Sequence, residues 1–194
     1  MSDLTITNAG VSVTPNSAGS SISTGKRKVI RVTPTCSTTT LTTGEVIFNA
    51  AEIPNAVKED GGCSKLIHAY VIDYTGATND FVTIFHETSG IDLGPTDSSS
   101  SANISEANTR LLKVTGMMAS DSSDTDYSIS AANIVHNLNA AALTTNTGSE
   151  GPIKMFPILL QAAEGSTSAY FSAITKTSET FAADSLEFIF HIEY

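Results

Sequence analysis

The stretch SLEFIFHIEY, residues 185–194, decides the fold class. Every second residue in it is apolar: Leu186, Phe188, Phe190, Ile192 and Tyr194. Between them stand Glu187, His191 and Glu193, with Ile189 as the one apolar exception. This period of two is typical of a strand with one buried and one solvated face. Because the last residue is aromatic and falls on the buried face, we expect the C-terminus to be fixed inside a sheet.

Length and charge narrow the classes of protein to which the chain can belong. A chain of 194 residues is long enough for one β-domain with a substantial core. Its 20 acidic and 10 basic residues give a net charge of −10, which argues against nucleic acid or an anionic membrane as the main partner. No apolar run is long enough to cross a membrane, and the start does not resemble a signal peptide. These features predict a soluble protein made in the cytoplasm.

The first 33 residues differ from the rest in composition and charge. They hold one acidic residue and four basic ones, whereas the remainder holds nineteen acidic and six basic residues. Residues 8–25 are mostly small and polar and cannot bury enough apolar surface to offset their ordering entropy. We therefore expect an extended N-terminal arm over residues 1–33, ending in a short strand at Val29–Val32, and a single domain over residues 34–194.

The basic residues of this arm are the candidate partner-binding residues: Lys26, Arg27, Lys28 and Arg31. A basic segment beside a flexible arm is suited to docking on an acidic partner, including the acidic body of a neighbouring copy. The alternative interpretation is a solvated strand flank with no binding role.

The body alternates apolar runs with polar loops. Strands are expected at Val29–Val32, Gly44–Phe48, Leu66–Asp73, Phe81–His86, Leu111–Thr115, Ile153–Leu160, Ser168–Ile174 and Ser185–Tyr194. About eight strands at regular intervals predict an all-β fold, a single β-sandwich of jelly-roll type, rather than alternating strands and helices.

Some finer predictions follow from the same runs. Leu66–Asp73 is largely apolar on both faces, which predicts a central strand. It is expected to form a hairpin with Phe81–His86, and Ser168–Ile174 is expected to form a second hairpin with the last strand. Asn49–Lys58 is ambiguous and fits one helical turn interrupted at Pro54.

Motifs that carry chemistry are weak in this sequence. Gly19–Lys26 has the wrong spacing for a phosphate-binding loop, and Arg27 stands where a Ser or Thr would reach magnesium. The carboxylates of Asp121, Asp124 and Asp126 fit a solvated acidic loop better than a calcium site. A G-x-S-x-G nucleophile motif is absent. We therefore predict no catalytic residue and no cofactor, and a protein that is not an enzyme.

Histidines and cysteines leave two questions open. His68, His86 and His191 each lie on an expected strand, so three imidazoles could converge on zinc. The metal interpretation is disfavoured, because their spacing does not require convergence and His191 fits a surface position on the polar face of the last strand. Cys36 and Cys63 are expected to be free buried thiols. A disulfide between them is the alternative if the protein matures outside the cell.

Several segments resemble the β-rich virion structural proteins of tailed bacteriophages, especially marine and cyanobacterial ones. The resemblance covers roughly residues 40–194 and lies in Gly44–Ile47, in Gly61–Gly62 leading into Leu66–Asp73, in Ile104–Asn108, in Pro157–Tyr170 and in the terminal strand. It is one of pattern, because these segments carry no diagnostic chemistry. The chain departs from the family pattern in its longer Ser-rich arm and in the Ala/Asn-rich stretch 131–147.

The resemblance implies a head decoration (cement) protein or another accessory capsid protein. Such proteins often have jelly-roll-like sandwiches and are commonly trimeric, and the major capsid protein is then the expected partner on the surface of the virion. Many weak contacts on a repetitive shell become strong through multivalency. A tail, fibre or other host-facing binding module is the first alternative, and a metal-dependent or carbohydrate-active enzyme of jelly-roll type is the second.

Overall fold

A computed structural model describes residues 6–8, 11–13, 27–76, 79–89, 93, 96, 114–120, 127–130, 133–137, 139–140 and 157–194. Every regular element in these residues is a β-strand, as the pattern of the terminal stretch predicts. They are β1 (Ile6–Asn8), β2 (Val11–Val13), β3 (Arg27–Val32), β4 (Thr40–Leu41), β5 (Val46–Ile53), β6 (Cys63–Asp73), β7 (Phe81–His86), β8 (Val114–Ala119), β9 (Tyr127–Ser130), β10 (Asn133–Asn137), β11 (Asn139–Ala140), β12 (Ile158–Gln161), β13 (Ala169–Thr175), β14 (Glu179–Thr180) and β15 (Leu186–Glu193).

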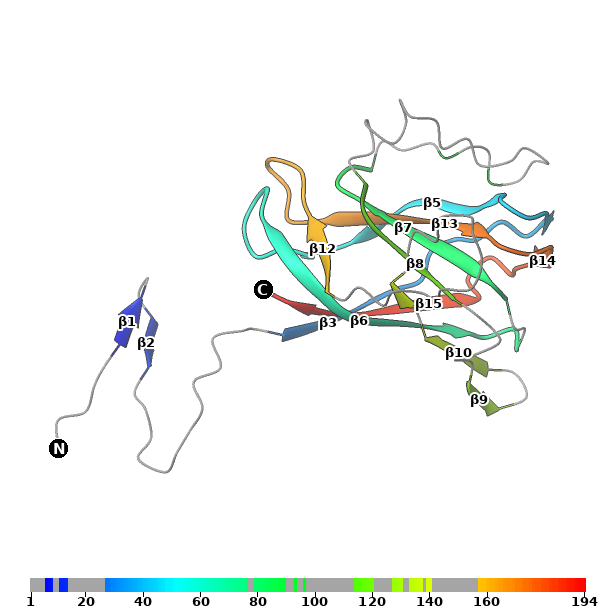
Figure 1. Cartoon of the computed structure of the whole chain (residues 1–194), viewed down its shortest axis with the longest axis horizontal. Helices are drawn as coiled ribbons and strands as arrows, with labels where there is room; N and C mark the ends of the chain where they lie inside the picture. The colour runs from blue at the N-terminus through cyan, green and yellow to red at the C-terminus, as the bar shows by residue number, and fades with distance from the viewer. Residues whose placement is uncertain are drawn as a thin grey trace, which may run out of the picture.

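Two antiparallel sheets pack face to face (Figure 1). The first sheet has the order β3-β15-β6-β10-β9, and β12 also pairs with β6. The second sheet has the order β11-β8-β7-β13-β5. The predicted all-β sandwich is therefore confirmed at the level of two packed sheets.

The strand β6 organises the first sheet. It pairs with β15 along one edge over nearly its whole length. On its other edge, the part near Cys63 pairs with β12 and the part near Asp73 pairs with β10. The predicted central position of Leu66–Asp73 is thus correct, and the strand begins three residues earlier than expected.

Both predicted hairpins are wrong. β6 lies in the first sheet and β7 in the second, and β13 lies in the second sheet while β15 returns to the first. The connections after β6 and after β13 carry the chain across the sandwich rather than back along the same sheet. A period of two along each strand identifies a strand but does not identify its partner.

The ambiguous segment Asn49–Lys58 is not a helical turn: residues 49–53 are the second half of a strand, and residues 54–58 follow it outside any helix or strand. β5 extends from Val46 to Ile53 and pairs with β13. Its register shifts near Ala50, which has a φ of 44° and donates its N–H to Ser172 Oγ at 2.9 Å. A bulge of this kind interrupts the alternation of side chains, which explains why the sequence pattern is ambiguous there.

The last strand is buried as predicted. β15 lies between β3 and β6 in the first sheet. Leu186, Phe188, Phe190 and Ile192 are fully buried on its inner face, while the Tyr194 hydroxyl donates to the Asn55 carbonyl at 2.6 Å. The C-terminus is therefore tied into the body by backbone pairing and by this side-chain bond.

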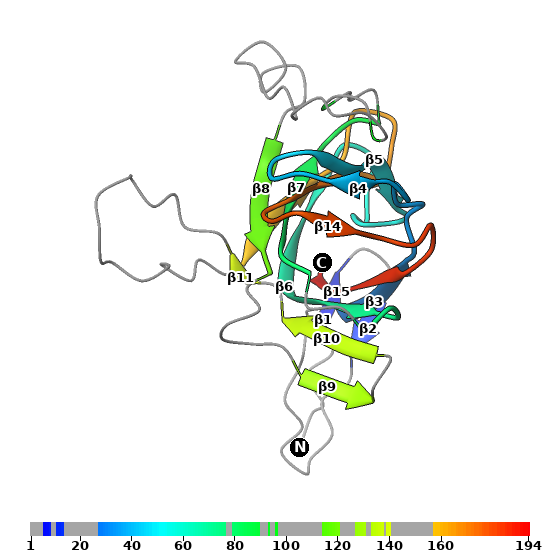
Figure 2. The same ribbon diagram turned by 90° about the vertical axis from the view of Figure 1, so that its right-hand side faces the viewer.

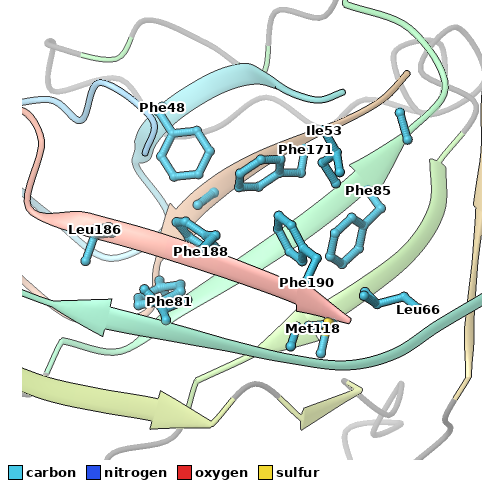
Figure 3. Close-up of a cluster of buried hydrophobic side chains, with 14 of the residues drawn as sticks. Phe48, Ile53, Leu66, Phe81, Phe85, Met118, Phe171, Leu186, Phe188 and Phe190 are labelled. Carbon is cyan, nitrogen blue, oxygen red and sulfur yellow. The ribbon is translucent and has the colours of Figure 1, made fainter. Parts of the chain in front are cut away.

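Phenylalanines fill the space between the sheets (Figure 3). Phe188 and Phe190 of β15 point at Phe171 of β13, with ring centroids 4.9 and 5.1 Å apart. Phe48 of β5 lies 5.2 Å from Phe171, also edge to face. Edge-to-face pairs of this kind contribute about 0.5–1.5 kcal/mol each beyond the burial of their area. The core thus joins residues from strands that are far apart in sequence.

Short strands complete the described chain. β4 and β14 pair with each other at the end of the sandwich that faces the viewer in Figure 2. β1 and β2 form a two-stranded sheet of their own. Within the predicted arm, residues 27–32 form β3 and pair with β15, so this part of the segment belongs to the first sheet. No helix among the described residues is long and apolar enough to cross a membrane.

Candidate functional site

The two outward faces of the sandwich differ in how far they are covered. The covered face is the outward side of β5, β13, β7 and β8, where Val46 and Ile84 are buried against Leu93, a residue of the chain beyond β7. The open face is the outward side of β3, β15, β6 and β12. Its residues are Arg27, Val29, Arg31, Lys65, His68, Tyr70, Ile72, Leu159, Glu187, Ile189, His191 and Glu193. Of these, Ile189 is buried among its neighbours.

Large apolar side chains are exposed mainly on the open face. Among the described residues, four large hydrophobic side chains are exposed, and three of them lie on this side of the molecule. Val29 is 52% exposed, Leu159 is 49% exposed, and Tyr74, directly after β6, is 48% exposed. They lie at separate places on this side, Val29 on β3, Leu159 on β12 and Tyr74 after β6, so each offers its own apolar contact to another molecule.

Cross-strand ion pairs balance the charge of the open face. Glu187 accepts from Arg31 Nη1 at 3.0 Å through one oxygen and from the Tyr74 hydroxyl at 2.7 Å through the other. The hydrogen bond from Tyr74, and then that from Arg31, lower the pKa of the Glu187 carboxyl. Arg27 Nε lies 3.5 Å from Glu193 Oε1. Exposed pairs of this type add little to stability, but each has no net charge, so this face lacks the excess negative charge of the rest of the protein.

The candidate partner-binding residues therefore have different environments. Arg27 and Arg31 are paired with carboxylates of the last strand. Lys28 is exposed on the edge strand β3, and Lys26 lies outside the described residues. The basic cluster predicted from the sequence is thus partly neutralised within its own chain, which the sequence cannot show because the register between β3 and β15 decides it.

Three rings form a cluster in the middle of the open face. His68, Tyr70 and His191 have ring centroids 5.8 Å apart in every pair. His68 and His191 are direct cross-strand partners, the last pair in the regular register that runs from Leu186 and Asp73, and the register shifts directly after them. Burial, and then the charge of His191, lower the pKa of His68. His191 Nε2 is buried and has no hydrogen-bond partner among the described residues.

His86 lies elsewhere, so three histidines do not converge as the zinc hypothesis requires. It belongs to β7 in the second sheet and is fully buried. Its Nδ1 lies 2.7 Å from the Thr88 carbonyl and its Nε2 lies 3.0 Å from Ser172 Oγ. Burial lowers the pKa of His86 to about 4, which keeps the ring neutral at pH 7. Of the predicted trio, only His68 and His191 are neighbours.

The cysteines, the acidic loop and the glycine-rich segment are the remaining candidates from the sequence. Cys36 is a buried free thiol whose pKa burial raises to about 12, and Cys63 is a free thiol that is exposed rather than buried. Asp121, Asp124, Asp126 and the glycine-rich segment 19–26 lie outside the described residues. Within the described part of the chain, no group of three or more His, Cys, Asp or Glu side chains is arranged to hold a metal ion.

Comparison with known proteins gives no match: no family model, no curated protein and no solved structure is similar to this chain.

Proposed function

We propose that this chain is a non-enzymatic structural protein of a bacteriophage particle. Specifically, it is a decoration (cement) protein that binds the major capsid protein on the outer surface of the head and bridges capsomers. It acts as a homotrimer and is assembled in the host cytoplasm. The resemblance found in the sequence suggests this class, and the contrast between the open and covered faces supports it.

We also infer that the sandwich is a jelly roll. The strand pairs are nested: β3 with β15, β5 with β13, β6 with β12, and β7 with β8. A long hairpin rolled over on itself has this order, and such double sheets are common in viral capsid proteins and lectins. The topology alone does not give a function, because one fold supports many functions. It is nevertheless compatible with a coat component.

The open face is the observation on which the proposed docking depends. The protein carries a net charge of −10, so an average patch of its surface repels another copy and any acidic shell. On the open face, the pairs Arg31–Glu187 and Arg27–Glu193 balance the charge, and exposed Val29 and Leu159 provide apolar contact. This face therefore combines weak repulsion with apolar surface, which suits repeated contacts strengthened by multivalency.

The packing of the core supports a structural role over a ligand-binding one. A jelly roll that binds a small molecule between its sheets needs an interior cavity lined by polar groups. Here the interior is occupied by contacting phenylalanine rings from both sheets, Phe48, Phe171, Phe188 and Phe190 among them. The histidines that suggested a metal-dependent enzyme lie outside this interior or are hydrogen-bonded within the second sheet.

Locating the chain in intact particles of the virus that encodes it tests the proposal. Electron microscopy is expected to find it on the outer surface of the head, in hundreds of copies. A handful of copies at the tail would instead establish the fibre or host-facing alternative, and absence from the particle would refute both. Sedimentation of the purified protein is expected to give the mass of a trimer, and a monomer at the concentrations found in the cell would contradict that part.

Two lysines allow a matched test of the open face. Lys65 is exposed on β6 opposite Glu193 and Leu159, whereas Lys58 is exposed on the loop after β5. The substitution Lys65→Glu is expected to reduce occupancy on purified heads, because it adds uncompensated negative charge to the docking surface. Lys58→Glu makes the same charge change elsewhere and is expected to leave occupancy unchanged. Equal effects of the two substitutions would rule out this face as the docking surface.

The arm is tested separately. A chain that lacks residues 1–25 keeps β3 and the pairing of Arg27 and Arg31 with the last strand. If the arm reaches across to a neighbouring subunit, this deletion lowers occupancy on heads even though the open face is intact. Unchanged occupancy would refute a role for the arm and leave docking to the open face alone.

A further inference from the structure

The strongest unexplained feature of the open face is the pair His68 and His191. The two residues are direct cross-strand partners on β6 and β15, and their ring centroids lie 5.8 Å apart with an interplanar angle of 64°. Side chains directly opposite each other on antiparallel strands are close enough to share one ligand. The backbone pairing on both sides holds this relation fixed, so the pair is preorganised by the sheet.

His191 has an unsatisfied polar atom. Its Nε2 is buried and has no hydrogen-bond partner among the described residues. A buried nitrogen without a partner is destabilising, and an ion or a water is one way in which folded proteins satisfy such an atom. His68 beside it is exposed, so its ring can turn without disturbing the core. A ligand that enters between the two rings would satisfy the nitrogen.

The chemistry of the pair selects the ligand. Neutral imidazole nitrogen is a ligand of choice for zinc, nickel and copper, whereas calcium and magnesium prefer oxygen. A histidine must be neutral to bind a metal, so binding at this pair is expected to compete with protonation. The charged groups nearby are already paired, Glu193 with Arg27 and Glu187 with Arg31, and Lys65 is exposed. Among the described residues of this face, they leave the two imidazoles and the exposed Cys63 thiol as unpaired ligands, and only the imidazoles face each other.

We propose that His68 and His191 form a two-histidine binding site for a divalent transition-metal ion of the zinc, nickel and copper class. Two histidines do not fill the coordination sphere of zinc. Zinc takes four ligands, so two positions remain for water or for side chains of another molecule. Tyr70 flanks the pair, with its ring centroid 5.8 Å from each imidazole, and limits access from its own side. A metal held in this way lies at the centre of the open face.

Calorimetric titration of the full chain tests the site. The protein is prepared without a polyhistidine tag and with Cys63→Ser, because the exposed Cys63 thiol would otherwise compete for the metal. Titration with nickel(II) and with zinc(II) at pH 7.5 is expected to give one ion per chain. His68→Ala and His191→Ala are each expected to weaken the Kd at least tenfold, which corresponds to about 1.4 kcal/mol.

Two controls keep the result interpretable. His136→Ala removes a histidine whose position on β10 pairs with Val71 rather than with the His68–His191 pair, and it is expected to leave the Kd unchanged. His68→Gln keeps a polar side chain at an exposed position, so it separates loss of a ligand from loss of fold, which thermal unfolding monitors. The proposal is overturned if the wild-type chain takes up no ion, or if His68→Gln and His191→Ala bind as tightly as the wild type.

Discussion

The covered face buries Val46, Ile84 and Leu93, whereas the open face leaves Val29 and Leu159 about half exposed. The two faces belong to sheets of similar construction that share one phenylalanine core. Their histidines show the difference most clearly. His86 on the covered face is hydrogen-bonded through both nitrogens and burial lowers its pKa to about 4. His68 on the open face is exposed and stands beside a histidine with an unsatisfied nitrogen.

Under the proposed function, this contrast assigns stability to one face of the domain and binding to the other. A face buried by its own chain contributes to folding, and substitutions there are expected to be costly. A face that keeps apolar and imidazole groups exposed contributes little to folding, and those groups are available to a partner or an ion. Four predictions, from the largest expected effect to the smallest, follow from that difference.

The largest effect is expected from removing the residue that covers the second sheet. Leu93 is fully buried against Val46 and Ile84. Leu93→Ala leaves a cavity there and is expected to lower the free energy of unfolding by about 2–5 kcal/mol. Urea denaturation followed by circular dichroism measures this change. A loss below about 0.5 kcal/mol would show that the two faces are equally open.

Acidification is expected to act mainly through the covered face. The folded pKa of His86 is about 4, below its ordinary value of 6.5, so the unfolded chain binds the proton more readily between these pH values. Stability is therefore fully present above pH 6.5 and falls as the pH is lowered towards 4, by about 3 kcal/mol from this residue. Urea denaturation midpoints measured from pH 7 to pH 4 report this loss of stability.

His86→Gln removes the ionisable group from the same position. The variant keeps an amide that can bond to Ser172 and Thr88, and it is expected to have a flatter dependence of stability on pH. His68→Gln, which changes an exposed histidine on the open face, is expected to flatten it much less. Equal slopes in the wild type and in His86→Gln would contradict the assignment of the acid sensitivity to His86.

The third prediction concerns stability at the edge of the sandwich where β8 of the second sheet contacts β12 of the first. A Cβ atom added at Gly116 of β8 would stand 2.4 Å from Ile158 Cγ2 of β12. Gly116→Ala is therefore expected to force the two strands apart and to cost about 1–3 kcal/mol. The paired variant Gly116→Ala with Ile158→Ala is expected to recover part of the loss, and a strict sum of the two single effects in denaturation would contradict the contact.

The sequence predicts individual strands well and their pairing poorly. The alternation in Leu186–Ile192 identifies a buried strand because each side chain reports on its own exposure. The sequence does not show that the chain crosses from one sheet to the other between β6 and β7. A polar loop between two apolar runs has the same composition whether the chain turns back into the same sheet or enters the other one. The bulge near Ala50 also hides half of β5, because its side chains lose the regular alternation.

The candidate site depends on pairing for the same reason. His68 and His191 become neighbours only through the register of β6 with β15. Arg31 finds Glu187 through the register of β3 with β15. The expected strands therefore singled out three histidines but could not show that His86 would be placed in the other sheet.

The smallest effect on stability is expected on the open face. Val29 is 52% exposed on β3, so Val29→Thr changes little buried surface, and a β-branched side chain is kept for the strand. We expect the free energy of unfolding to change by less than about 0.5 kcal/mol. The same urea titration used for Leu93→Ala measures it, so the two substitutions compare the two faces directly. If Val29→Thr were as costly as Leu93→Ala in the isolated protein, Val29 would have to be buried in solution by another copy of the chain. Repeating the titration at several protein concentrations would then reveal that copy, because the stability of an associated form rises with concentration.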